Sequence, residues 1–154
     1  MSVNLSEAIP AARILAPLRA ETDDDALSRL LAAVAGDLEM PDAAGVLDRL
    51  LHEPVLRAAL VGHGAAIIHS RIDRLPRSVT ALGVAPPGTS FRFGGGFRYV
   101  VSVIFLVLSP PEPPEPHLEL VSAIAGFVRN PRALDGLKAA VSPEQAAQAL
   151  AVAG

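Results

Sequence analysis

The chain has 154 residues, a net charge of −3 and no cysteine, so thiol nucleophiles, disulfides and thiolate metal sites are excluded. Its acidic balance, with only five Phe and one Tyr available for base stacking, argues against nucleic-acid binding. The apolar runs are far shorter than the roughly 20 residues that cross a bilayer and no signal peptide is evident, so we expect one cytoplasmic domain over residues 1–154, without membrane insertion.

The first third of the chain predicts helices. Residues 5–18 are expected to form a short helix or turn, because prolines interrupt them. Apolar side chains recur at helical spacing from residue 27 onward, and Asp23 or Asp24 is a candidate cap for this helix. A second amphipathic helix is expected between Pro41 and Pro54, with an apolar face formed by Val46, Leu47, Leu50 and Leu51.

Strands are expected in the middle of the chain. Residues 65–68 form a short apolar run that Gly62-His63-Gly64 opens and that ends at His69. Residues 77–85 form a second candidate strand. Residues 99–108 are apolar on both alternating faces, which is the pattern of a central strand covered on both sides of a sheet.

A proline-rich segment, residues 109–116, precedes the last third of the chain and favours an extended loop within one domain. Apolar spacing predicts a helix from Leu118 to Val128, and Asn130 is expected to cap the next helix. Ser142-Pro143-Glu144-Gln145 is a capping box for the last one. Together these patterns predict an α/β fold, a single-domain sandwich with a central mixed β-sheet flanked by helices.

His69 is the first candidate for chemistry. Its ordinary pKa of about 6.5 leaves a neutral, nucleophilic ring nitrogen near neutral pH. The preceding Gly62-His63-Gly64 offers backbone N–H groups that an anion can approach closely. The pattern suggests a phosphoryl group on His69, with Gly62, His63 and Gly64 as phosphate-binding residues. The alternative is a structural histidine at the end of a strand.

His117 is the second candidate. It is expected in the first turn of a helix, where free N–H groups and a partial positive charge favour bound phosphate. A histidine at a strand end and another at a helix start can share one anion if the fold brings them together. The alternative for His117 is a surface residue at a helix cap.

The region from Leu50 to Arg71 resembles the signature of enzyme IIA of the bacterial sugar phosphotransferase system, in its fructose/mannitol/nitrogen-regulatory class. The family pattern G-x-G-x-A-x-P-H is matched at Gly62, Gly64, Ala66 and His69. The order continues with the long apolar strand, the loop and a histidine-leucine run from His117 that is similar to the family's second active-site histidine. The resemblance extends over most of the chain.

The resemblance implies a mannitol-type enzyme IIA fold and no cofactor. It implies that His69 accepts a phosphoryl group from the phosphocarrier protein HPr or its nitrogen-branch relative, while His117 hydrogen-bonds the phosphate. The partners that it implies downstream are a IIB domain or a regulatory target. A regulatory protein of the nitrogen type is favoured over a sugar-specific permease component.

The chain also departs from the family pattern. Ile68 replaces the family proline, Ala59 replaces a threonine, and Glu53 stands at the position of an arginine in a gap-free match. A carboxylate repels phosphate where arginine binds it, and Arg57 or Arg71 is a candidate substitute. These departures support a second hypothesis, a degenerate enzyme IIA-like module that binds partners without carrying phosphate.

Two further kinds of chemistry are disfavoured. A hydrolase that uses His69 as its base lacks an identifiable nucleophile or metal. The four histidines lack the H-x-x-x-H spacing and the acidic partner of a zinc site, so no metal is expected. The triple glycine at 94–96 is expected to be a turn, because no Lys-Ser/Thr pair follows it.

Overall fold

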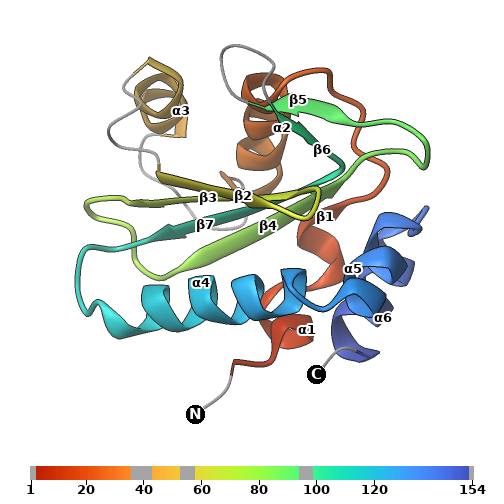
Figure 1. Cartoon of the computed structure of the whole chain (residues 1–154). Coiled ribbons are helices and arrows are strands. Elements are labelled where there is room, and N and C mark those ends of the chain that lie inside the picture. The colour runs from red at the N-terminus through yellow and green to blue at the C-terminus, as the bar shows by residue number, and fades with distance from the viewer. Residues whose placement is uncertain (1–2, 36–42, 53–57, 94–98, 153–154) are drawn as a thin grey trace.

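The computed structural model describes residues 3–35, 43–52, 58–93 and 99–152. Figure 1 shows three layers, in which a central sheet lies between helices on both of its faces. None of the helices in these ranges is long and apolar enough to cross a membrane. The elements are α1 (Leu5–Ala8), a 3₁₀ turn (Ala11–Arg13), β1 (Ile14–Leu15), α2 (Asp23–Ala35), α3 (Ala43–His52), β2 (Ala58–Gly62), β3 (Ala65–Arg71), β4 (Val79–Val84), β5 (Phe91–Phe93), β6 (Tyr99–Val101), β7 (Val103–Ser109), α4 (Glu115–Val128), α5 (Pro131–Lys138) and α6 (Pro143–Val152).

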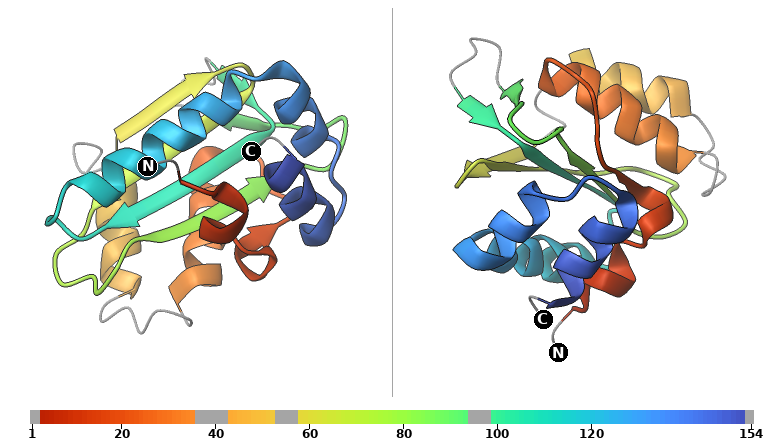
Figure 2. Two further views of the ribbon diagram at one scale, coloured as in Figure 1. Left: turned by 90° about the horizontal axis from the view of Figure 1, so that it is seen from below. Right: turned by 90° about the vertical axis from the view of Figure 1, so that its right-hand side faces the viewer.

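The main sheet has the strand order β1-β4-β7-β3-β2 and is mixed. β7 lies in the centre, parallel to β3 and antiparallel to β4, while β2 runs antiparallel to β3. All seven residues of β7 are buried, because α2 and α3 cover one face of the sheet and α1 and α4–α6 cover the other (Figure 2). The predicted α/β sandwich with a mixed central sheet is therefore confirmed.

The expected long strand at 99–108 is divided into two strands. Ser102 separates β6 from β7, and β6 pairs with β5 in a second, two-stranded sheet. The backbone of Ser102 accounts for the break, since its N–H donates to the carbonyl of Gly64 and its carbonyl accepts from Ala85 N–H. Val100, expected in the core, is 63 % exposed as a result.

The core has two halves, one on each face of the main sheet. Alternation along β3 and β7 supplies both halves, since successive side chains of a strand point to opposite faces. Ala66 and Ile68 pack toward α2, whereas Ala65 and Ile67 pack toward α4. Burying one large aliphatic or aromatic side chain contributes about 1.5–3 kcal/mol, so the two clusters hold the helices on the sheet.

The structure corrects the predicted start of α2. The Thr22 hydroxyl accepts a hydrogen bond from the N–H of Asp25, so Thr22 is the cap and both Asp23 and Asp24 lie inside the first turn. Their carboxylates remain favourable there because the helix N-terminus is partially positive.

The predicted caps of the last two helices are confirmed. Asn130 Oδ1 accepts from the N–H of Ala133 at the start of α5, and Ser142 Oγ accepts from Gln145 N–H at the start of α6. Leu118, expected in the apolar stripe of α4, is instead 59 % exposed. The expectations for Glu53, Pro54, Arg57 and the turn at 94–96 lie outside the described residues.

Candidate functional site

His69 lies inside β3 rather than at its end, two residues before the strand finishes at Arg71. The ladder continues through it, with Ala58 opposite on β2 and Val107 opposite on β7. Because Ala65 and Ile67 face α4, the same alternation directs His69 to the α4 face of the sheet. The imidazole is half-buried at this end of the sheet.

His117 approaches the same place from α4. Its helix begins at Glu115, directly after the proline-rich loop, so His117 is in the first turn as predicted. The side chain is only 4 % exposed, because α4 packs against the sheet along β3 and β7. The loop therefore brings a histidine 48 residues further along the chain back to His69.

The two histidines are in direct contact. Nδ1 of His69 lies 3.1 Å from Nε2 of His117, and the ring centroids are 5.1 Å apart with the planes inclined at 53°. At this separation one nitrogen donates a hydrogen and the other accepts it. The structure thus joins the two residues that the sequence singled out separately.

Two serines that were not among the predicted site residues extend this contact. Ser109, the last residue of β7, places its Oγ 2.8 Å from Nδ1 of His117 and is 1 % exposed. The hydroxyl of Ser78 donates to Ser109 Oγ at 3.0 Å. The available signal was a lone polar residue that ends a wholly apolar strand immediately before the proline-rich loop.

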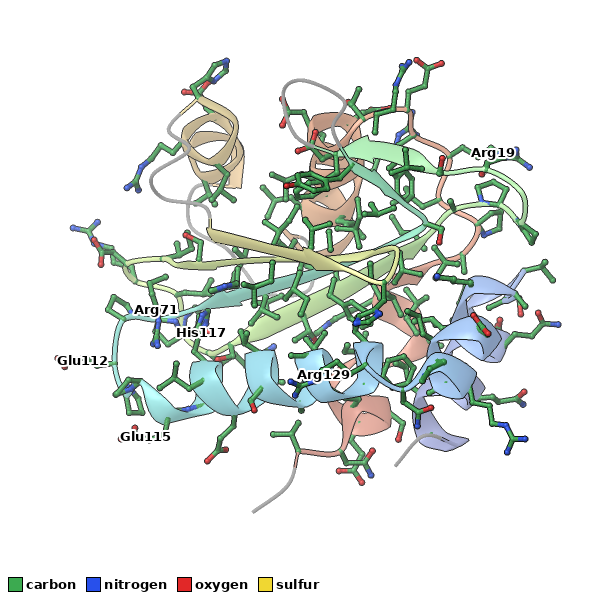
Figure 3. The ribbon with its side chains drawn as sticks, in the orientation of Figure 1. Arg19, Arg71, Glu112, Glu115, His117 and Arg129 are labelled. Atoms are coloured by element: carbon green, nitrogen blue, oxygen red, sulfur yellow. The ribbon has the colours of Figure 1, made fainter. Side chains whose placement is uncertain are left out.

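Arg71 fastens the proline-rich loop beside the histidines. It lies two residues after His69 and thus on the same face of β3. Nη1 of Arg71 donates to the carbonyls of Pro110 and Pro111, and Nη2 donates to the carbonyl of Pro114. Figure 3 shows Arg71 and His117 at the same end of the sheet, next to the loop.

This environment keeps both imidazoles neutral. Burial is the main cause that lowers the pKa of His69, and the Arg71 guanidinium lowers it further. Burial, then Arg71, then His69 lower the pKa of His117 from 6.5 to about 4. A neutral ring has a nitrogen lone pair, so each histidine is available near pH 7 as a nucleophile or a hydrogen-bond acceptor.

Gly62, His63 and Gly64 do not lie at the histidine pair. They form the turn between β2 and β3, at the opposite end of β3 from His69. Five residues of strand at about 3.3 Å each put Gly64 roughly 16 Å from His69. Lys138 Nζ donates to the His63 carbonyl there, and the positive φ of His63 (57°) and Gly64 (82°) identifies a tight hairpin turn. Gly62 and Gly64 therefore flank or form this turn, apart from the histidine pair.

The residues that the structure describes contain no group of three or more His, Asp or Glu side chains able to hold a metal ion. Within the described residues, Ser109 is a hydrogen-bond partner of the histidine pair and Arg71 is a charged neighbour. Two neutral imidazoles beside a guanidinium can bind an anionic group.

Solved structures with a similar fold carry the names of phosphotransferase-system proteins. The nitrogen regulatory protein IIA-Ntr from Neisseria meningitidis matches with a TM-score of 0.77 and 20 % identity, over 95 % of this chain and 98 % of that one. The mannitol enzyme IIA of Escherichia coli, in complex with phosphorylated enzyme IIB, matches with a TM-score of 0.72 and 15 % identity, over 92 % and 96 %. These likenesses establish the fold.

The sequence comparisons give the family. Among curated proteins, no sequence matches the chain significantly. Residues 7–152 match the protein family described as phosphoenolpyruvate-dependent sugar phosphotransferase system, EIIA 2. The match spans nearly the whole chain and includes both histidines, the proline-rich loop and every strand of the main sheet. The chain therefore belongs to the EIIA 2 family of the phosphoenolpyruvate-dependent sugar phosphotransferase system.

Proposed function

We propose that residues 1–154 act as one carrier domain that accepts a phosphoryl group on His69. The donor is the phosphohistidine of an HPr-like phosphocarrier protein, or of its nitrogen-branch relative, in the cytoplasm. The observation that carries the proposal is the 3.1 Å contact between Nδ1 of His69 and Nε2 of His117. It occupies one nitrogen of His69 and leaves Nε2 as the atom available to phosphorus.

The transfer needs His69 as a neutral nucleophile. With the hydrogen of His69 on Nδ1 and directed at His117, the lone pair of Nε2 is free. Nε2 forms the new bond to phosphorus while the P–N bond of the donor breaks and its electron pair returns to the donor nitrogen. No proton leaves His69 in this step, since Nδ1–H remains bonded to His117.

His117 and Arg71 then stabilise the phosphorylated state. Attachment of phosphorus places positive charge on the His69 ring, and the Nε2 lone pair of His117 accepts the hydrogen that this charge makes more acidic. Arg71 adds a fixed positive charge that lowers the pKa of both histidines and attracts the phosphoryl oxygens. Arg71 thus takes the role that an arginine at the position of Glu53 would otherwise have.

The phosphoryl group would next pass to a IIB domain or act as a regulatory signal, and we favour the regulatory role of a nitrogen-type enzyme IIA. The fold likeness to IIA-Ntr supports this choice. A cheap test is the binding of a phosphocarrier of each branch to the unmodified chain, followed by the rate at which each one labels it. Faster labelling by HPr than by the nitrogen-branch carrier would instead assign the chain to sugar transport.

The decisive experiment is incubation with phosphoenolpyruvate, enzyme I and HPr, followed by intact-mass measurement at alkaline pH, where phosphohistidine survives. We expect the mass of one phosphoryl group to be added, and peptide mapping to place it on His69. Omission of enzyme I is the control for non-enzymatic labelling.

A degenerate interaction module is the second candidate. It is favoured by the replacement of the family proline with Ile68, which is fully buried on the face of β3 opposite the histidines. Wild-type protein that folds with the His69–His117 contact intact but never takes up phosphate would support this module and contradict the carrier.

A further inference from the structure

His117 is held from both sides, and Ser109 is the partner on the side away from His69. Nδ1 of His117 lies 2.8 Å from Ser109 Oγ, while Nε2 lies 3.1 Å from Nδ1 of His69. Ser109 and His117 are 1 % and 4 % exposed, so bulk water does not compete for this bond. The tautomer of His117 is therefore decided by the serine and the neighbouring histidine.

Two directions of donation are compatible with these distances. A neutral imidazole donates at one nitrogen and accepts at the other. If Nδ1 of His117 donates to Ser109, then Nε2 of His117 accepts from Nδ1 of His69, and Nε2 of His69 keeps its lone pair. If Ser109 donates to His117, each hydrogen shifts in the opposite direction, and Nε2 of His69 carries a hydrogen and cannot attack phosphorus.

We propose that Ser109 is a positioning residue that accepts a hydrogen bond from Nδ1 of His117 and thereby keeps Nε2 of His69 unprotonated for phosphoryl transfer. The inference rests on the proposed function. Ser109 acts through His117 and touches neither the phosphoryl group nor His69.

The contact with Ser78 is compatible with this direction, and the need for a free lone pair on Nε2 of His69 selects it. A serine oxygen has two acceptor lone pairs, so Ser109 Oγ accepts from the Ser78 hydroxyl and from Nδ1 of His117 together. The position of Ser109 is fixed independently of its side chain. Its carbonyl accepts from Ile72 N–H, and its backbone forms the last pair of the β3–β7 ladder, opposite Arg71. The hydroxyl is thus presented to His117 by the sheet itself.

The test measures tautomers and rates in the same proteins. The chain is labelled with ¹⁵N-histidine, and the ring nitrogens of His69 and His117 are recorded by NMR at a pH well above both ring pKa values. We expect the hydrogen on Nδ1 of both rings in the wild type. Ser109→Ala should leave His117 as a mixture of tautomers and slow labelling by phospho-HPr about tenfold, as expected for one lost hydrogen bond. Ser109→Thr keeps the hydroxyl and should restore both.

Ser70→Ala is the matched control. Ser70 is another buried serine next to the site, but its side chain lies on the same face of β3 as Ile68, opposite the histidines. Its loss should therefore leave both the tautomers and the labelling rate unchanged.

Two results would overturn the proposal. One is a wild-type His117 that carries its hydrogen on Nε2, a measurement that needs no variant to fold. The other is a folded Ser109→Ala protein with unchanged tautomers and labelling rate. The NMR measurement requires no phosphate, so a wild type that never becomes labelled refutes the proposed function while the tautomers still decide the role of Ser109.

Discussion

Two histidines lie near opposite ends of β3, and their surroundings differ. Near one end His63 is exposed in a two-residue hairpin turn, where its backbone carbonyl accepts a hydrogen bond from Lys138. At the other end His69 is half-buried and bonded through its ring to His117. The same side chain is a turn residue in one place and a candidate nucleophile in the other. The difference comes from what the fold places against the imidazole.

The largest expected contrast is between His69→Ala and His63→Asn. His69→Ala should abolish labelling by phospho-HPr, because only the residue that forms the P–N bond is indispensable. His63→Asn should be labelled at the wild-type rate, since asparagine tolerates the positive φ of this turn and the site is roughly 16 Å away. Intact mass after a time course checks both. Labelling that persists in His69→Ala would place the nucleophile elsewhere.

The next largest effect is expected for His117→Ala. This variant keeps the nucleophile but loses the acceptor for Nδ1–H of His69, so it should still become labelled, about 10²–10³-fold more slowly, and pass the group on poorly. Quenched-flow labelling followed by transfer to an acceptor protein measures both steps. A wild-type labelling rate for His117→Ala would show that the histidine contact is structural and does not contribute to phosphoryl transfer.

The pH dependence of the free energy of unfolding tests whether burial keeps His117 neutral. The pKa of His117 is about 4 in the folded chain and near 6.5 when unfolded, so the unfolded chain binds more protons between these values. The free energy of unfolding should therefore fall as the pH is lowered from about 6.5 to about 4, and this contribution should be complete at higher pH.

Urea titrations across this pH range check the prediction, with His117→Gln as the comparison. The fall should be smaller in His117→Gln than in the wild type. Identical pH profiles for wild type and His117→Gln would show that the imidazole is not held neutral by its burial.

The smallest effect is expected at the hairpin end, and it concerns stability alone. Gly64 has a φ of +82°, and an added Cβ would lie 2.8 Å from Lys138 Nζ, so Gly64→Ala should cost about 1–2 kcal/mol. Gly62 has open space for a Cβ and no positive φ, so Gly62→Ala is a matched control with little cost. Thermal unfolding measures both, and each variant should be labelled like the wild type. Slower labelling of Gly62→Ala would indicate that these glycines contribute to the phosphate site.

Local patterns predicted the elements that depend on neighbours in sequence. Asn130 and Ser142 were correctly identified as caps because a capping bond spans only three residues. The cap at Thr22 was not predicted, because Thr22, Asp23 and Asp24 are all good cap residues. Which of them is the cap depends on the residue at which the helix begins, and the sequence pattern does not specify that residue. The division of residues 99–108 at Ser102 depends on bonds to Gly64 and Ala85, which no local pattern contains.

The candidate site divides in the same way. The sequence by itself determined the α/β class, the family resemblance and the two histidines, because these follow from periodicity and from short motifs. Only the tertiary structure decided which residues meet. β3 and β7 lie side by side and the proline-rich loop returns the chain to them, so His69, Ser109 and His117 converge although 48 residues separate the two histidines. The glycines of the motif lie far from His69, because the extended strand β3 separates the residues at its two ends.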